Sequence, residues 1–595
     1  MRLFFKYFLA ALLAIMAFFL IIVLFIAIMA GSSGDKTVDV EDHSILYMDF
    51  KNEIVDYAPE QAIDFDFNTF QPIQKDGLSD VLRQLKKAKA DDRIDGIFME
   101  MTTVKSGLSS AQEIREALID FKESGKWIIA YSDMYSQGAY YMASVADEVY
   151  LQPEGMMELK GFNASTMFLK NMLDKVGVDM QVIRPKNNKF KSAVEPFLLD
   201  SMSAANEEQL TKILESIWAK VSEDIATSRN LSQTELDAAT ESLASRNAEY
   251  ATEAGLIDGA KYKDEILVML KERTETPLDE DLSAYSLGEY KSAKVKDLED
   301  PFVDFAKDKI AIVYAEGEIQ DGEGQAGQII GGAGMSRMIR EARRDSSIKA
   351  VVLRVNSPGG SALASDLIWR EVVMTKEVKP VIVSMGNVAA SGGYYISCPA
   401  DRVFANKTTI TGSIGVFGTI PNTQELQEDY LGITHDGVKT HAFADLFEMH
   451  RPMREDELAV WQEAVDDIYD DFTGKVADGR SVEQTFVDSI GQGRVWSGSD
   501  ALEIGLIDEW GGLMAAVEEA VELSEVEDYR IKVFPEPEDP VQAILKELGM
   551  AKASYDPLDM LSGEERELLS KLRYYQRIAS TKGVHARMPF DLEIR

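Results

Sequence analysis

One sequence pattern occurs twice in this chain of 595 residues, at an almost constant spacing. Matching residues stand 254 positions apart, and the pairs are Asp91 with Asp345, Ile94 with Ile348, Tyr140-Tyr141 with Tyr394-Tyr395, Asp147 with Asp401, and Val149 with Val403. Further along, the run 254–258 returns as 504–508. A period of this length indicates a duplicated domain rather than a solenoid of short repeats. The chain is therefore expected to fold as two copies of one domain.

Each copy alternates strand-like and helix-like segments. In the first copy, strands are predicted at 44–48, 95–101, 127–131 and 148–151, and helices at 78–90, 110–122 and 140–144. In the second copy, strands are predicted at 309–315, 350–355, 380–385 and 402–405, and helices at 336–344 and 365–374. Strands that alternate with helices pair in parallel. The predicted fold class is α/β.

The length exceeds that of one ordinary domain, so the chain is divided by composition. We expect a cytoplasmic stub and membrane anchor, a first copy, a polar linker, a second copy and a tail, at 1–34, 35–274, 275–301, 302–535 and 536–595. The tail contains helical patterns at 540–548 and 564–578, and no chemistry is evident in it.

The N-terminal segment is strongly apolar. An uncharged run from 7 to 34 follows Arg2 and Lys6, and it is longer than the ~20 residues that span a bilayer. It also exceeds the roughly 7–15 residues of a signal-peptide core, although a removed signal peptide is the alternative. Basic residues before the run and Asp35 after it predict a cytoplasmic N-terminus. In both cases the main body is expected to be exported.

Charge and cysteine content exclude several functions. The formal net charge of −39 argues against nucleic-acid binding, which needs a basic surface. Cys398 is the single cysteine, so neither an intrachain disulfide nor a cysteine-based zinc site is possible. The five histidines show no metal-ligand spacing, so no metal or other cofactor is expected. Cys398 lies in an apolar stretch and is expected to be a buried core thiol rather than a nucleophile.

Small residues crowd around one serine of the second copy. Ser391 follows the predicted strand 380–385 and precedes glycines and a helix-compatible run. A serine on such a turn exposes its hydroxyl, and the N–H groups that follow it, beginning with Gly392, can stabilise an oxyanion. A second turn, 356–360, also follows a strand and offers N–H groups on Gly359 and Gly360. The alternative is that both turns only allow close backbone packing.

The two copies differ at these turns. At the spacing of 254, Ser391 corresponds to Gln137, and the glycine-containing turn 356–360 corresponds to 102–106, which has no glycine. Only the second copy can therefore carry a serine nucleophile of this kind.

A serine hydroxyl needs a general base. Of the histidines, His441 is the candidate for a Ser-His-Asp triad, although its surroundings carry no recognisable signature. The alternative base is a lysine whose pKa is lowered by burial. Lys186, Lys189 and Lys191 are the candidates, and composition alone would make them a solvated basic loop.

Four motifs together resemble the signal peptide peptidase A family, also called protease IV, in its long duplicated form. In chain order they are Lys191-Ser192-Ala193-Val194-Glu195-Pro196-Phe197, Asn356-Ser357-Pro358-Gly359-Gly360, Ala390-Ser391-Gly392-Gly393-Tyr394-Tyr395 and Thr411-Gly412-Ser413-Ile414-Gly415. The likeness extends from the anchor to about Gly512. It implies a tandem duplication of a Clp-protease/crotonase-like domain, preceded by one transmembrane helix.

The resemblance also implies roles for single residues. Ser391 would be the nucleophile, Lys191 the general base and Ser413 the residue that orients the lysine. Either Gly359 or Gly360, with the N–H of Gly392, would form the oxyanion hole. Such a dyad would join a base from the first copy to a nucleophile from the second copy, so both copies must dock for activity. Enclosure of the amine between them would supply the burial that lowers its pKa.

The function implied is a membrane-anchored serine endopeptidase that degrades signal peptides and other apolar peptides after export, without a cofactor. By resemblance, we expect a homotetramer and a single-pass protein of a bacterial inner membrane, with the catalytic body on the outer, periplasmic side. Two alternatives differ in class. One is a crotonase-like acyl-CoA enzyme on the same fold, and the other is a non-catalytic membrane-associated scaffold.

Overall fold

The computed structural model describes residues 6–7, 16, 38–58, 64–66, 71–73, 75–296, 298, 300–302, 305–536 and 584–588. Apart from Tyr7 and Met16, the anchor predicted at 7–34 lies outside these residues, and so do both helical patterns of the tail. Within the part of the chain that is described, no helix combines the length and the apolar character needed to cross a membrane.

The first copy is built on a six-stranded sheet in which all neighbouring strands are parallel, in the order β10-β8-β7-β6-β1-β11. Its strands are β1 (Ser44–Met48), β6 (Ile94–Glu100), β7 (Trp127–Tyr135), β8 (Glu148–Met157), β10 (Gly259–Ala260) and β11 (Ala284–Ser286). Parallel sheets are covered on both faces. Helices α2 (Leu78–Ala90), α3 (Leu108–Lys122) and α4 (Gln137–Ala143) contribute to the main core, and α10 (Lys263–Arg273) buries Ile266 and Leu270 in a separate cluster with Ile129.

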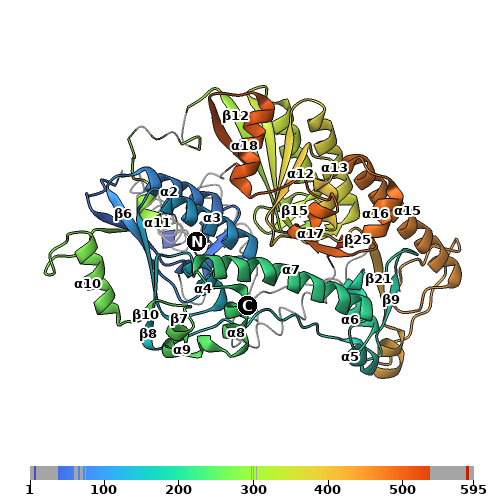
Figure 1. Ribbon diagram of the computed structural model, residues 1–595. Coiled ribbons are helices and arrows are strands. Elements are labelled where there is room, and N and C mark those ends of the chain that lie inside the picture. The colour runs from blue at the N-terminus through green and yellow to red at the C-terminus, as the bar shows by residue number, and fades with distance from the viewer. Residues whose placement is uncertain are drawn as a thin grey trace.

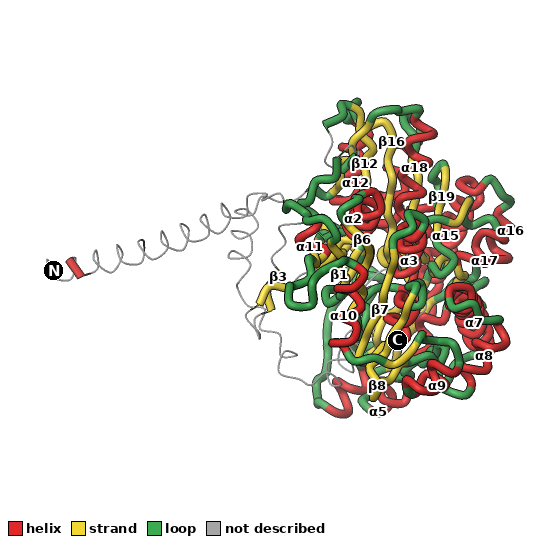
Figure 2. Tube along the Cα trace, turned by 60° about the vertical axis from the view of Figure 1, so that its left-hand side comes forward, coloured by secondary structure: helices red, strands yellow, loops and turns green. Residues whose placement is uncertain are grey.

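The second copy repeats this design with an eight-stranded sheet. Its main order is β22-β20-β18-β16-β12-β24, and β19 pairs with β18 and β23. Its strands are β12 (Asp308–Glu316), β16 (Ile348–Ser357), β18 (Val381–Ala390), β19 (Arg402–Ala405), β20 (Ile410–Gly412), β22 (Val495–Ser497), β23 (Glu509–Trp510) and β24 (Tyr529–Phe534). Its helices include α12 (Gly332–Arg344), α13 (Ala362–Lys376), α14 (Gly392–Ser397), α17 (Gly498–Glu503) and α18 (Leu513–Ser524). In Figure 2 the strands run through the body with helices on either side of them.

The predicted alternation of strands and helices is confirmed in both copies. Helix α2 has the predicted bounds, whereas α3, α4, α12 and α13 begin two to four residues earlier than predicted. Helix α13 begins at Ala362 instead of 365, because the hydroxyl of Ser361 accepts a hydrogen bond from the N–H of Ala364 and caps the helix. Strand β11 lies inside the predicted linker 275–301, and it pairs with β1. The linker thus adds an edge strand to the first sheet.

A third sheet combines strands from both copies and the tail, and the sequence did not predict it. Its order is β14-β15-β13-β17-β25-β21-β9. Its strands are β9 (Asp179–Ile183), β13 (Glu318–Gln320), β14 (Gly324–Gln325), β15 (Ile329–Gly331), β17 (Gly359–Ser361), β21 (Phe417–Asn422) and β25 (Val584–Arg587). Figure 1 shows β9 and β21 side by side, far from the first copy's own sheet. The first copy therefore extends a segment that contains β9 and the residues after it up to Lys191, called the arm below, to the second copy.

Helix α7 (Ala204–Ser228) runs from this arm back to the first copy, along the lower side of Figure 1. The hydroxyl of Ser216 on α7 lies 2.7 Å from that of Ser497 in the second copy. Between the copies, the guanidinium of Arg354 is fully buried, and it donates to Asp56 at 2.8 Å and to Glu113 at 2.7 Å. Removing one partner of a buried ion pair leaves an uncompensated charge, so this contact ties the two copies together.

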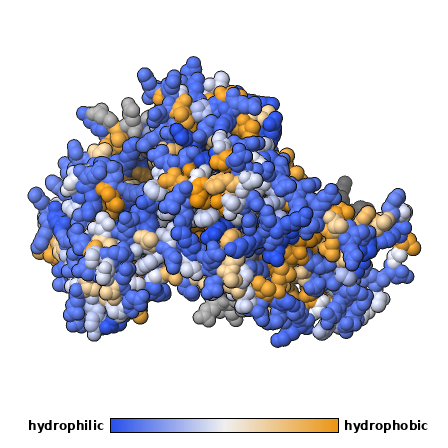
Figure 3. Space-filling view, turned by 45° about the vertical axis from the view of Figure 1, so that its right-hand side comes forward, coloured by the Kyte–Doolittle hydropathy of each residue, from blue (hydrophilic) through white to orange (hydrophobic). Residues whose placement is uncertain are grey.

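The surface reflects the acidic composition. The face in Figure 3 is mostly hydrophilic, with apolar side chains gathered in patches. On the second copy, the segment 430–449 exposes several large apolar side chains, namely Tyr430, Leu431, Ile433, Val438, Phe443, Phe447 and Met449.

Candidate active site

Ser391 occupies a strained turn between β18 and α14. Its backbone has φ of 55° and ψ of −113°, a conformation that costs a non-glycine residue roughly 1–3 kcal/mol. The turn is held from both sides, because the Ser391 N–H donates to the carbonyl of Gly412 at 2.8 Å and the Ser391 carbonyl accepts from the N–H of Tyr395 at 2.8 Å. A Cβ on Gly393 would lie only 2.6 Å from the carbonyl oxygen of Ser357, so close packing requires glycine there.

Lys191 reaches this serine from the first copy. It follows β9, on the arm that joins the third sheet, and only 1% of it is exposed. Its Nζ lies 3.0 Å from the Oγ of Ser391 and 3.0 Å from the Oγ of Ser413, and 3.3 Å from the Ser413 carbonyl oxygen. The hydroxyls of Ser391 and Ser413 thus both lie at the amine of Lys191, although Ser413 is 222 positions away in sequence. All three residues were proposed from the sequence.

The surroundings of Lys191 favour its neutral form. Burial lowers the pKa of the Lys191 amine well below its usual value of 10.5, because an ammonium ion loses its hydration there. A neutral amine at 3.0 Å from a hydroxyl is within reach to accept its proton.

Two features that hold Lys191 were missed in the sequence analysis. The side-chain amide of Gln209, on α7, donates to the carbonyl of Phe190 at 3.0 Å and to the hydroxyl of Ser192 at 2.9 Å. Gly493 has φ of +81°, and a Cβ on it would lie 2.5 Å from the Cβ of Lys191. The sequence signal was the Gly491-Gln492-Gly493 run, whose function becomes clear only when the arm is seen against it.

The two candidate oxyanion glycines have different surroundings. Gly359 has φ of +100°, and a Cβ on it would lie 2.7 Å from the backbone nitrogen of Gly392. Gly360 packs instead against Ile319, whose carbonyl oxygen would lie 1.9 Å from a Cβ on it. Gly359 is thus the glycine that adjoins Gly392, a distinction that adjacent residues cannot reveal in the sequence.

The other candidate residues lie elsewhere. His441 is exposed, and its ring contacts the hydroxyl of Thr440. Lys186 and Lys189 are mostly exposed, with side-chain exposures of 88% and 58%. Cys398 is fully buried, and burial raises the pKa of its thiol to about 12, as expected of a core residue.

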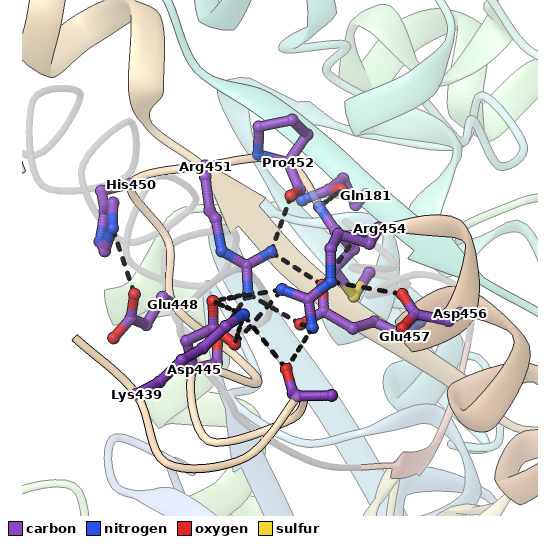
Figure 4. A network of polar contacts seen from close by, with 12 residues as sticks. Gln181, Lys439, Asp445, Glu448, His450, Arg451, Pro452, Arg454, Asp456 and Glu457 are labelled. Carbon is purple, nitrogen blue, oxygen red and sulfur yellow. Dashed lines mark hydrogen bonds and ion pairs between the residues drawn. The ribbon is translucent and has the colours of Figure 1, made fainter. Parts of the chain in front are cut away.

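Figure 4 shows the network of polar contacts around Asp445 and Glu457, close in sequence to His441. Lys439 binds Asp445 at 3.0 Å, and Asp445 also binds Arg451 and Arg454, which share Glu457. The basic residues of this loop are therefore engaged in a surface network. Among the described residues, no group of His, Cys, Asp and Glu is arranged to hold a metal ion.

Comparison with known proteins identifies the family of this chain. The model of peptidase family S49 matches residues 120–276 and 374–527, one stretch in each copy. Protease 4 of Haemophilus influenzae is 34% identical over 86% of this chain and 85% of its own length, and Protease 4 of Salmonella typhi is 35% identical over 78% and 74%. A solved ClpP1 variant from Listeria monocytogenes, 15% identical, covers 35% of this chain and 94% of its own, with a TM-score of 0.24.

These matches confirm the resemblance to the protease IV family and the duplication. The matched family and both relatives are peptidases, which favours neither of the alternatives, an acyl-CoA enzyme or a non-catalytic scaffold. The chain belongs to peptidase family S49 and is a serine peptidase composed of two copies of the family's domain.

Proposed function

We propose that this peptidase is a membrane-anchored endopeptidase that uses Ser391 as nucleophile and Lys191 as general base. The observation that carries the proposal is the position of the Lys191 Nζ, 3.0 Å from the hydroxyls of both Ser391 and Ser413. Ser413 orients the amine, and the arm of the first copy supplies it to a nucleophile of the second.

The reaction has two halves. Lys191 accepts the proton of the Ser391 hydroxyl as Oγ attacks the peptide carbonyl carbon, and the N–H groups of Gly392 and Gly359 stabilise the oxyanion. The ammonium then returns the proton to the leaving amine, which gives an acyl-enzyme and a free peptide. In the second half, Lys191 takes a proton from a water molecule as the water oxygen attacks the ester carbon. The bond between that carbon and the Ser391 Oγ then breaks, Lys191 returns the proton to Oγ, and the acyl fragment leaves as a carboxylic acid.

The proposed substrates are signal peptides and other apolar peptides left after export. The predicted anchor at 7–34 would hold the site beside the membrane that releases such peptides. The proposed location is a bacterial inner membrane with the body on the periplasmic side. Labelling Cys398→Ser chains that carry single engineered cysteines at 3 and at 51, with a membrane-impermeant thiol reagent in intact spheroplasts, tests it: the site at 51 should react and the site at 3 should not.

We also propose that the chain assembles into a symmetric homo-oligomer, with about four subunits by analogy with the family. Support comes from the exposed apolar segment 430–449, where Val438, Leu431 and Tyr430 are 105%, 60% and 56% exposed. Light scattering on the purified chain measures the mass. A monomer that persists at every concentration would contradict the proposal.

The dyad is tested by labelling the full chain, purified in mild detergent, with a fluorophosphonate serine probe. The native chain should be labelled, and Ser391→Ala and Lys191→Met should abolish labelling. Lys189→Met is the matched control, because it removes an exposed lysine two residues away and should label like the native chain. Labelling that survives Lys191→Met would assign the base to another residue, and loss of labelling in the control would point to a folding defect.

A further inference from the structure

Strand β25 of the C-terminal tail lies between two strands that border the proposed active site. Its residues pair antiparallel with β17, with Gly359 opposite Arg587, Gly360 opposite Ala586 and Ser361 opposite His585. On its other side it pairs antiparallel with β21, with Phe417 opposite His585 and Gly418 opposite Val584. In Figure 1 it appears beside α17 and above β21. A short extended segment that fills the gap between two strand edges binds as a peptide ligand binds by strand addition.

The backbone of this strand passes along the candidate oxyanion glycines. The carbonyl oxygen of Ala586 lies 2.2 Å from where a Cβ on Gly359 would be, and 3.2 Å from where one on Gly392 would be. Beyond the strand, the N–H of Met588 donates to the carbonyl of Pro358 at 2.7 Å. The tail thus occupies main-chain hydrogen-bonding groups of the same turn that is proposed to receive the substrate carbonyl.

The side chains of the segment are also accommodated. Ala586 is fully buried and Met588 is 3% exposed, and the two alternate residues face the same way along an extended chain. Met588 belongs to the same buried apolar cluster as Ala390, the residue before Ser391. Between them, Arg587 forms an ion pair with Glu318 of β13. Burial of small and apolar residues at alternate positions is the pattern expected of a bound apolar peptide.

With β25 in place, the reacting groups are closed to solvent, since Ser391 and Lys191 are 0% and 1% exposed. An open cavity of about 660 Å³ lies instead at the seam between the copies, where Asn356 and Asn387 contribute to its lining and Ser391 does not. The space beside the nucleophile is therefore filled by the chain itself.

We infer that the segment Val584–Met588 occupies the substrate groove as a tethered competitor of peptide substrates. The inference rests on the proposed function, because it takes Ser391 and the glycine turns as the site. It also predicts that a bound substrate runs antiparallel to both β17 and β21, as β25 does. Glu318 would then bind a basic side chain of the substrate, at the position that Arg587 occupies in the tail. Because the segment belongs to the same chain as the site, its effective concentration there is about millimolar, as for a ligand on a short flexible linker.

The first test uses Ala586→Asp in the full chain, which would place a carboxylate at a fully buried position and expel the strand while leaving the tail attached. The KM for a fluorogenic apolar peptide should fall about tenfold with kcat unchanged, as expected when a competitor at ~millimolar effective concentration is removed. Arg587→Gln, which removes the ion pair with Glu318, should lower KM less. Arg402→Gln removes an exposed ion pair with Glu519 and should leave KM unchanged.

The second test does not depend on catalysis. A fluorescent peptide with the sequence of 584–589 should bind the double variant Ser391→Ala, Ala586→Asp, measured by fluorescence polarisation, and bind at least tenfold more weakly to Ser391→Ala with its tail native. The same peptide with Asp at its alanine should not bind. If the chain lacks peptidase activity but this binding pattern holds, the proposed dyad fails and the tail inference stands.

Two results would overturn the inference. One is an Ala586→Asp chain whose KM equals that of the native chain, together with no binding of the peptide to the double variant. The other is an intact mass for the active native chain that shows cleavage within 584–588, because a segment that is cut is a substrate rather than a lasting competitor.

Discussion

The scaffold bonds of the two copies match, whereas their catalytic turns do not. The hydroxyl of Tyr140 donates to the carbonyl of Leu256 at 2.7 Å, and that of Tyr394 donates to the carbonyl of Leu506 at 2.8 Å. The aspartates of the repeat behave alike: Asp147 accepts from the N–H of Ile128, Asp401 from Val381, Asp258 from Val149 and Asp508 from Val403. The residues that recur at the spacing of 254 or 250 are therefore those that fasten helices and loops to the sheet.

At the position of Ser391, the first copy has a side chain with a structural role. Gln137 is 2% exposed, its Oε1 accepts from the N–H groups of Lys160 and Gly161 at 2.9 and 3.0 Å, and its Nε2 donates to the carbonyl of Gly161. Gln137 lies within α4 with ordinary helical backbone, whereas Ser391 has positive φ. At this position, only the copy with the proposed nucleophile has a strained backbone. In the proposed dyad, the first copy supplies the base and the second copy supplies the nucleophile.

The contrast between the copies would be wrong if adding a serine hydroxyl at position 137 were enough to make the first copy catalytic. We predict that Gln137→Ser, introduced into Ser391→Ala, leaves activity at least about 10³-fold below the native chain. The first copy has ordinary helical backbone at position 137, has no glycines in the turn 102–106 that corresponds to 356–360, and has the amine of nearby Lys160 paired with Glu158. Peptide hydrolysis measures the outcome, with Ser391→Ala alone as the baseline. Recovery above that baseline would show that the scaffold suffices.

The second prediction concerns the seam that brings the halves together. At the spacing of 254, Arg354 corresponds to Glu100, so this guanidinium is particular to the second copy. Arg354→Ala leaves the buried carboxylates of Asp56 and Glu113 unpaired, and we expect the free energy of unfolding to fall by about 3–5 kcal/mol. Denaturant unfolding measures it. Arg337→Ala, at an exposed ion pair with Glu323, should change the free energy by less than about 1 kcal/mol.

The repeat predicted the sheets because it marks residues whose role is local to each copy. It could not predict the third sheet, where β9, β17, β21 and β25 come from segments up to about 400 positions apart and carry no shared period. For the site, the family motifs pointed to Lys191, whose local composition suggests a solvated loop. The contribution of Gln209 depends on how α7 packs against the Lys191 segment of the same copy, and that of Gly493 arises from the contact between the copies. The choice between Gly359 and Gly360 likewise depends on neighbours that are remote in sequence.

A pair of glycines can sharpen the comparison between a scaffold turn and a catalytic turn. Gly493 and Gly505 both have positive φ, +81° and +74°, so replacement by alanine strains both, at about 1 kcal/mol each. A Cβ on Gly493 would meet Lys191, whereas one on Gly505 would have no neighbour within 4 Å. We predict that Gly493→Ala lowers kcat about 10²-fold, because a base displaced by about 1 Å loses its geometry. Gly505→Ala should change kcat less than threefold, and equal losses would show that the lysine is not positioned by Gly493.

The smallest expected effect is a gain in stability on removing the proposed base. The unfolded chain protonates Lys191 near pH 10.5, whereas burial lowers its pKa in the folded state. Between these two pH values the unfolded state binds more protons, so the native chain loses stability as pH falls, and the penalty is complete below the folded pKa. Lys191→Met keeps the volume and removes this penalty, so the free energy of unfolding should rise by about 1–2 kcal/mol at neutral pH, with the difference vanishing above pH 10.5.

Lys379→Met is the informative contrast, because the Lys379 ammonium donates to the carbonyls of Ala342, Asp345 and Ile348 and its loss should destabilise the fold. If thermal unfolding across this pH range shows both variants destabilised alike, Lys191 is a structural lysine, and the division of the dyad between the copies would have to be abandoned.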